Sequence, residues 1–138
     1  MEYVLMIGIA LSGKTTFRKA NFDHEVVQLS YFGNNRKKEL KYIEDCLKEG
    51  KNVVVDDTNL TRNIRKMHID LAKKYDAQVI GIFMNTSVGL IEQRRTRRNE
   101  QFPMAVINKQ LKDLETPNKD EGFDKLLVYK NYEQPRST

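Results

Sequence analysis

Cysteine and long apolar runs are scarce in this chain of 138 residues, and each scarcity excludes a class of protein. A single cysteine, Cys46, excludes an internal disulfide framework. Together with His24 and His68 it is too little for a zinc site built from cysteine and histidine alone. The longest apolar run, residues 3–12, is too short to span a bilayer. Met1 leads straight into an acidic residue rather than a secretory signal, so we expect a cytoplasmic protein with no membrane contact.

Charge is what the chain has in abundance. Charged residues make up 31% and apolar residues 39%, a balance typical of a globular rather than a disordered protein. The net charge of +5 favours phosphorylated or polyanionic partners, although a surface of solvated lysines gives the same balance. The length suits one domain. We expect this domain over residues 1–130 and a polar tail over residues 131–138.

Strand-like and helix-like periods alternate along the chain. Short β-branched apolar runs predict strands, and apolar residues three and four apart predict helices. Strands are expected at residues 3–7, 26–29, 52–56, 79–84 and 125–129, and helices at residues 14–20, 34–49, 61–75, 88–98 and 103–114. This alternation predicts an α/β fold, a parallel sheet with helices on both faces. Ligands of such folds bind beyond the carboxyl ends of the strands.

A phosphate-binding motif follows the first predicted strand. Residues 8–15 read Gly-Ile-Ala-Leu-Ser-Gly-Lys-Thr, the pattern G-x-x-x-x-G-K-[ST]. The glycines let successive backbone N–H groups face one concavity, and the helix that follows adds its positive end. A lysine here reaches the β and γ phosphates, and a hydroxyl can hold the bridging Mg²⁺. We expect a nucleoside triphosphate, ATP, to be bound by Gly8, Leu11, Ser12, Gly13, Lys14, Thr15 and Thr16.

Two carboxylates end the third predicted strand. Asp56 and Asp57 follow Val53-Val54-Val55, where phosphate-loop proteins place an acid that holds magnesium. We expect Mg²⁺ to be held by Thr15 and Asp56. The alternative is that residues 57–59 form only a turn whose polar side chains cap the backbone.

From this point the sequence resembles the polynucleotide 5′-hydroxyl kinases, of which the phage end-repair kinase is one, and their zeta-toxin-like relatives. The resemblance begins with Asp-Thr-Asn-Leu at residues 57–60 and continues in the arginine-rich residues 90–98. Phe102-Pro103 and residues 121–124 extend it over nearly the whole chain. It implies a nucleotide-kinase fold with five parallel strands in the order 2-3-1-4-5, and ATP with Mg²⁺ as the phosphate donor.

Four arginines fall within five positions of one predicted helix. They are Arg94, Arg95, Arg97 and Arg98, and Arg94 and Arg98 share one face. Guanidinium groups stay charged and can clamp phosphate with two hydrogen bonds. The resemblance implies that Arg98, and secondarily Arg94, are lid residues that stabilise the transition state. A solvated helix face, or contact with nucleic-acid phosphates, are the alternatives.

The segment after the second strand departs from the family pattern. The family carries an Asp there, which takes the proton of the acceptor, and an Arg three residues later. Residues 30–36 contain no acid and end in Arg36. We expect Arg36 and Asp57 to act on the acceptor side instead. The region from Arg36 to Lys51 has room for one helix, so acceptor-binding surface is reduced.

The favoured function is transfer of the γ-phosphate of ATP to a hydroxyl, the 5′ end of DNA or RNA. Lys14, Asp57, Arg98, Arg94 and Arg36 are the expected catalytic residues. A kinase of a small molecule or protein, or a silent nucleotide-binding module, are the alternatives. Tyr31 and Phe32 could stack a base, although such residues more often belong partly to the core. Cys46 is expected to be a small core residue, and His68 a packed or surface histidine rather than a catalytic one.

Overall fold

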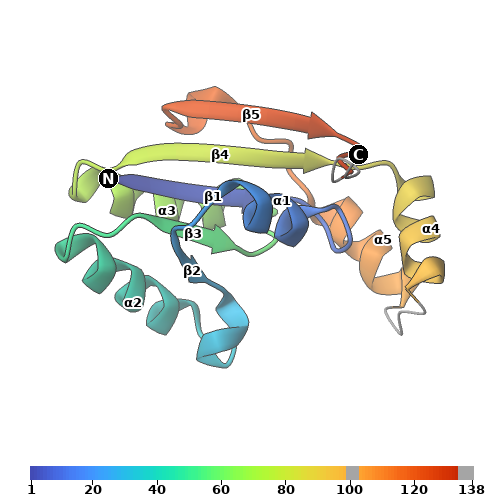
Figure 1. Cartoon of the computed structure of the whole chain (residues 1–138), viewed down its shortest axis with the longest axis horizontal. Coiled ribbons are helices and arrows are strands. Elements are labelled where there is room, and N and C mark those ends of the chain that lie inside the picture. The colour runs from blue at the N-terminus through green and yellow to red at the C-terminus, as the bar shows by residue number, and fades with distance from the viewer. Residues whose placement is uncertain (99–102, 134–138) are drawn as a thin grey trace.

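A computed structural model of the chain describes residues 1–98 and 103–133 (Figure 1). Phe102 of the resemblance and residues 134–138 of the expected tail lie outside this part. Strands and helices alternate along the chain as the periodicity predicts. The elements are β1 (Glu2–Ile7), α1 (Lys14–Asn21), β2 (Glu25–Val27), η1 (Leu29–Phe32), α2 (Arg36–Lys48), β3 (Val53–Asp56), α3 (Arg62–Lys74), β4 (Gln78–Asn85), α4 (Val88–Arg97), α5 (Met104–Asp113), η2 (Lys119–Glu121) and β5 (Lys125–Lys130).

The five strands form one sheet in the order β2-β3-β1-β4-β5, and every neighbouring pair is parallel. The expected order is confirmed. The first strand lies in the middle, with Leu5 opposite Val55 on one side and Gly81 on the other. Because all strands run the same way, the loops after β1, β3 and β4 gather at one edge of the sheet.

Each face of the sheet carries its own hydrophobic core. On one face, α2 and α3 pack Ile43 and Ile69 against Leu5, Val55 and other strand residues. On the other face, α1 packs Phe17 among Val4, Met6 and Ile82. A third cluster of Ile9, Ile91 and Ile107 joins the loop after β1 to α4 and α5. The three central strands β1, β3 and β4 are buried on both faces, which explains their unbroken hydrophobic runs.

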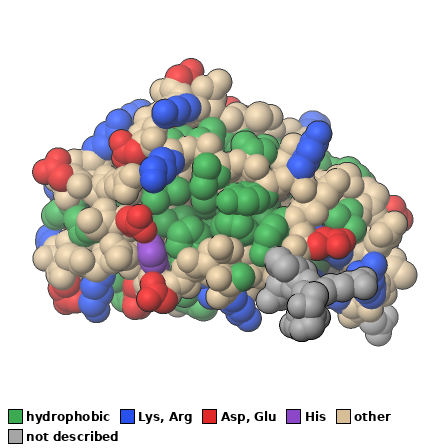
Figure 2. Space-filling view, turned by 45° about the horizontal axis from the view of Figure 1, so that its top comes forward, with side chains coloured by type: hydrophobic (Ala, Val, Ile, Leu, Met, Phe, Trp, Pro, Cys, Tyr) green, Lys and Arg blue, Asp and Glu red, His purple; other side chains and the backbone are tan. Residues whose placement is uncertain are grey.

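The face that carries α1 is incompletely covered. This helix has only eight residues and contributes one fully buried side chain, Phe17. Hydrophobic side chains gather at the surface of this face (Figure 2). Leu127 of β5 is 44% exposed.

Most element boundaries shift by one or two residues from the sequence prediction, and three differences have a clear physical reason. Leu29 begins a short 3-10 helix instead of ending β2, because its N–H donates to the carboxylate of Asp57 rather than to β3. Pro103 precedes α5 as its N-cap instead of occupying the first helical position. Tyr132, expected in a polar tail, packs its ring 5.1 Å from that of Phe17. No described helix is long and apolar enough to cross a membrane.

Candidate nucleotide and acceptor site

The loop between β1 and α1 has the backbone shape of a phosphate cradle. Gly8 and Gly13 have φ of +155° and +103°, and Leu11 lies between them at +63°. A β-carbon on Gly8 would lie 2.6 Å from Ser12 Oγ and 3.0 Å from the carbonyl oxygen of Met84. The first glycine of the motif is therefore required because a β-carbon has no room there, and the second because its backbone is left-handed.

Lys14 begins α1 and folds over the loop. Its Nζ donates to the carbonyl oxygens of Gly8 and Ile9, each at 2.8 Å. Removal of this ammonium group from water lowers the pKa of Lys14 to about 8, while Asp56 and Asp57 act in the opposite direction. A phosphate in the loop would offer the ammonium group a stronger, charged partner than two carbonyls.

Thr15 and Asp56 meet across the first and third strands. Thr15 Oγ1 donates to Asp56 Oδ2 at 2.9 Å, and Arg18 Nε lies 3.1 Å from the same oxygen. A hydroxyl and a carboxylate are the hard oxygen ligands that Mg²⁺ prefers. These two residues fit the expected magnesium site and would hold the ion. Bound Mg²⁺ neutralises charge on the phosphate oxygens.

The neighbouring strands hold the loop in place. Ser12 is buried, and its carbonyl oxygen accepts a hydrogen bond of 2.7 Å from Thr86 Oγ1 after β4. Asn59, in the left-handed conformation, donates through its amide to the carbonyl of Met6 at 2.7 Å. The N–H of Gly8 donates to the carbonyl of Thr58. The loops after β1, β3 and β4 are thus hydrogen-bonded to one another.

Arg94 ties α4 to this loop. Its guanidinium is buried and donates to the carbonyl of Leu11 at 2.8 Å and to the carbonyl of Tyr132. Burial, and then the positive charge of Arg98, lowers the pKa of Arg94. Both terminal nitrogens, Nη1 and Nη2, therefore have protein partners, so Arg94 holds the loop and the segment after β5 together.

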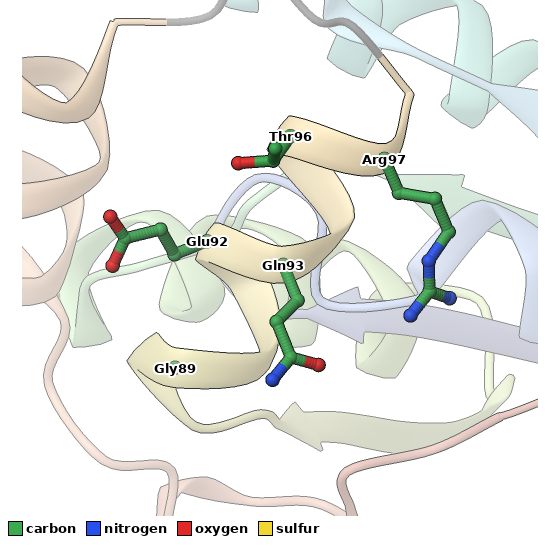
Figure 3. Close-up of a pocket in the computed structure, with 5 residues that line it drawn as sticks. All are labelled: Gly89, Glu92, Gln93, Thr96 and Arg97. Carbon is green, nitrogen blue, oxygen red and sulfur yellow. The ribbon is translucent and has the colours of Figure 1, made fainter.

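Two hollows flank α4. The first, of about 350 Å³, opens at Gly13 and Thr16 and is lined on its other walls by Arg94, Arg97, Arg98, Tyr132 and Glu133. The second, of about 520 Å³, lies along the outer side of α4 (Figure 3). Gly89, Glu92, Gln93, Thr96 and Arg97 line it. Arg97 belongs to both hollows, and exposed Arg98 faces the one at the phosphate loop.

Arg36 of α2 and Asp57, which follows β3, lie together near the start of α2. Arg36 Nη1 lies 2.7 Å from Glu39 Oε1 and 3.4 Å from Asp57 Oδ2. Asp57 Oδ1 accepts the N–H of Leu29 at 2.7 Å. The carboxylate of Asp57 is thus fixed by η1 and α2, and 9% of its side chain is exposed. The first turn of α2 follows the N-cap Asn35, whose side chain accepts the N–H of Lys38.

Sequence reasoning missed the residues that support the site. Arg65 of α3 is fully buried and makes a two-bond ion pair with Glu121, at 2.8 Å and 3.1 Å. The same guanidinium donates to the carbonyls of Asn59 and Leu60, at 3.0 Å each. Arg65 falls on a helix of otherwise ordinary amphipathic pattern. Its role is set by tertiary structure, since Glu121 lies 56 residues away.

The remaining candidate residues differ in their burial. Tyr31 is 60% exposed, whereas Phe32 packs its ring 5.4 Å from that of Tyr42. Cys46 is buried, as expected, and His68 is packed in the interior rather than placed at the surface. The His68 ring bonds to Tyr3 through Nδ1 at 2.6 Å.

Known proteins resemble this chain in sequence. A bifunctional polynucleotide phosphatase/kinase of Schizosaccharomyces pombe is 29% identical over 133 residues, covering 88% of this chain and 32% of that protein. An L-seryl-tRNA(Sec) kinase of Methanococcus maripaludis is 24% identical over 141 residues, covering 88% of this chain and 55% of that protein. The chain therefore spans about a third and about half the length of these relatives.

The solved structure of a sugar kinase from Janibacter sp. HTCC2649 shares the fold, with a TM-score of 0.72 and 17% identity. The match covers 95% of this chain and 86% of that one. A family model described as an AAA domain matches residues 4–117, from the first strand to beyond α5. With its phosphate loop, its acidic third strand and its arginine-rich α4 inside that range, the chain belongs to this family of P-loop kinase domains.

Proposed function

We propose that the protein transfers the γ-phosphate of ATP to the 5′-hydroxyl end of DNA or RNA. The hydrogen bond of 2.9 Å between Thr15 and Asp56, directly beside Lys14, carries the phosphoryl-transfer part of this proposal. It brings together the hydroxyl, carboxylate and ammonium groups that a Mg²⁺-bound triphosphate needs. Both named curated relatives act on nucleic-acid substrates, which supports a nucleic-acid acceptor.

On the donor side, the loop N–H groups and Lys14 hold the β and γ phosphates. Arg98 reaches the transferred phosphoryl group from the end of α4 and stabilises its developing charge. Arg94 positions the loop through the carbonyl of Leu11. The aromatic ring of Tyr132 and the side chain of Arg97 line the adjoining hollow, which suits the nucleoside of ATP.

On the acceptor side, Arg36 binds a phosphate of the acceptor and Asp57 accepts the proton of its hydroxyl. The hydroxyl oxygen forms a bond to the γ-phosphorus, and the bond from phosphorus to the oxygen bridging the β and γ phosphates breaks. The products are ADP and a 5′-phosphate. Because phosphoryl transfer depends mainly on positioning and charge, a weak base at Asp57 is sufficient.

The test is transfer from γ-labelled ATP with Mg²⁺ to oligonucleotides with a 5′-hydroxyl, beside a sugar and a small-alcohol panel. We expect label on the 5′ end and a fall of at least about 100-fold in kcat/KM for Lys14→Ala and Arg98→Ala. Lys74→Ala is the matched control, because Lys74 pairs with Glu44 at the far end of α3. Label on sugars alone contradicts the acceptor, and ATP binding without any transfer indicates a silent nucleotide-binding module.

A further inference from the structure

Three metal-ligating side chains meet beneath the acceptor side of the site. They are Glu39 of α2, Asp57 after β3 and His68 of α3. One ligand atom from each lies within 4.8 Å of the others. The side chains of Glu39 and His68 are fully buried, and that of Asp57 is 9% exposed. The cluster lies where α2 and α3 cover the same face of the sheet (Figure 1).

Two atoms of this cluster have no hydrogen-bond partner within the described residues. They are Glu39 Oε2 and His68 Nε2. Leaving a buried polar atom unpaired costs about 1–3 kcal/mol, so two such atoms in one cluster of metal-ligating residues indicate that something binds there. His68 Nε2 faces Glu39, with 3.8 Å between it and Oε1.

The other nitrogen of His68 is already engaged. Its Nδ1 lies 2.6 Å from the hydroxyl of Tyr3, which fixes the ring and leaves Nε2 directed at the carboxylates. Histidines that bind metals are commonly held in this way by an oxygen on their second nitrogen.

Arg36 is the cation that now lies beside the carboxyl groups of Glu39 and Asp57. It lies 2.7 Å from Glu39 Oε1 and 3.4 Å from Asp57 Oδ2, and makes no hydrogen bond to the unpaired Oε2. Its side chain is 24% exposed and so already meets solvent. A metal ion between the same carboxylates would repel the guanidinium, so the two cations would compete.

We propose that Glu39, Asp57 and His68 bind one divalent transition-metal ion, Zn²⁺ above all, in competition with Arg36. One imidazole nitrogen and two carboxylate oxygens are a donor set that zinc accepts and magnesium does not favour. The site is separate from the oxygen-only pair Thr15 and Asp56. As Arg36 and Asp57 also serve the acceptor under the proposed function, bound zinc lowers phosphoryl transfer, a consequence that rests on that function.

The first experiment measures zinc binding without nucleotide. The full chain is stripped with EDTA, dialysed into millimolar Mg²⁺ and titrated with Zn²⁺ in a calorimeter. We expect one ion per chain, with affinity lowered at least tenfold by His68→Gln or Glu39→Gln. His24→Gln is the matched control, because it removes the other histidine, which pairs with Glu2. No binding at one ion per chain, or equal losses for both histidine variants, overturns the proposal.

Competition gives a sharper readout. Arg36→Gln removes the resident cation and should tighten zinc binding severalfold, whereas a purely structural cluster would show no gain. Weaker or unchanged binding in this variant contradicts the competition.

Should His68→Gln fail to fold, nitrogen NMR of the wild-type chain decides. Zinc then shifts Nε2 of one histidine of the two, and a shift on neither histidine overturns the site. The calorimetric and NMR results do not depend on catalysis. A chain that binds zinc yet phosphorylates no acceptor would retain this site and lose the proposed function.

Discussion

Gly8 packs its α-carbon against Ser12 and the carbonyl of Met84, and a methyl group has no room there. Gly89 of α4 has the opposite surroundings, because nothing lies within 4 Å of a β-carbon added to it. The two glycines therefore differ in the space around them. Adding a methyl group is expected to lower the stability of the fold at Gly8 and to raise it at Gly89.

We expect Gly8→Ala to destabilise the protein by about 1–3 kcal/mol, since the added carbon must displace backbone as well as a side chain. Gly89→Ala, the matched control, should stabilise it by up to about 0.5–1 kcal/mol, because alanine favours the helix more than glycine does and Gly89 lies in the uncrowded first turn of α4. Urea unfolding of both variants measures the two effects. Equal effects of the two substitutions would show that the crowding at Gly8 is relieved by movement of the loop.

Glu39 gives the fold a pH dependence. Burial, and then its neighbour Asp57, raises the pKa of Glu39 to about 8, whereas an unfolded glutamic acid has a pKa near 4.5. Between these values the folded state holds a proton that the unfolded state releases. The free energy of unfolding therefore falls as pH rises, by roughly 1–2 kcal/mol between pH 6.5 and pH 8. Urea unfolding with EDTA present measures this slope, and Glu39→Gln should remove it.

At the scale of elements, one end of α3 and one end of α4 each carry an arginine that holds the loops of the site in place. Arg65, from the first turns of α3, binds the loop after β3 and the short helix η2 at once. Arg94, from the last turns of α4, binds the phosphate loop and the segment after β5. Each helix is an anchor that connects two loops of the site.

Removing the buried partner of an ion pair leaves a charge without compensation. We expect Arg65→Ala to cost about 3–5 kcal/mol of folding free energy. Arg62→Ala, three residues earlier, should cost about 0–1 kcal/mol, because Arg62 is half exposed and pairs with Asp120 at the surface. Thermal or urea unfolding of both variants measures the contrast. A double-mutant cycle with Glu121→Gln should give a coupling of about 0.5–3 kcal/mol, and a coupling of zero would contradict the pairing.

At the scale of the whole molecule, the rise in melting temperature on nucleotide binding should test whether the phosphate loop binds ATP. A ligand that binds only the folded state stabilises it by about 2.7 kcal/mol at 100 times its dissociation constant. We expect Mg²⁺-ATP to raise the melting temperature of the wild-type chain, and Lys14→Ala to abolish most of the rise. Differential scanning fluorimetry with and without nucleotide measures it. A rise that is the same in both chains would place the nucleotide outside the loop.

The sequence was sufficient for the order of elements because its signals are local. Unbroken β-branched runs predict strands buried on both faces, and the motif from Gly8 to Thr15 marks the loop without reference to the rest of the chain. The meeting of Thr15 and Asp56 followed from the parallel sheet, which brings the ends of β1 and β3 together.

Contacts between distant residues were beyond such reasoning. Nothing in the local pattern marks Glu39 as the buried partner of Arg36, or Arg65 as the partner of Glu121. Buried charges of this kind look like surface charges on an amphipathic helix until the packing is known. The role of Arg94 was open for the same reason, since its partners are backbone carbonyls that any residue could offer.

Because Cys46 is buried, a cysteine introduced at an exposed position can be labelled selectively. It is the one thiol of the sequence, it is 4% exposed, and burial raises its pKa, so reagents that seek thiolates react with it slowly. A cysteine introduced at exposed Thr96 would then be the fast-reacting thiol. A fluorophore attached there, on the helix that Arg94 fastens to the phosphate loop, would give an optical signal of nucleotide binding and release in real time.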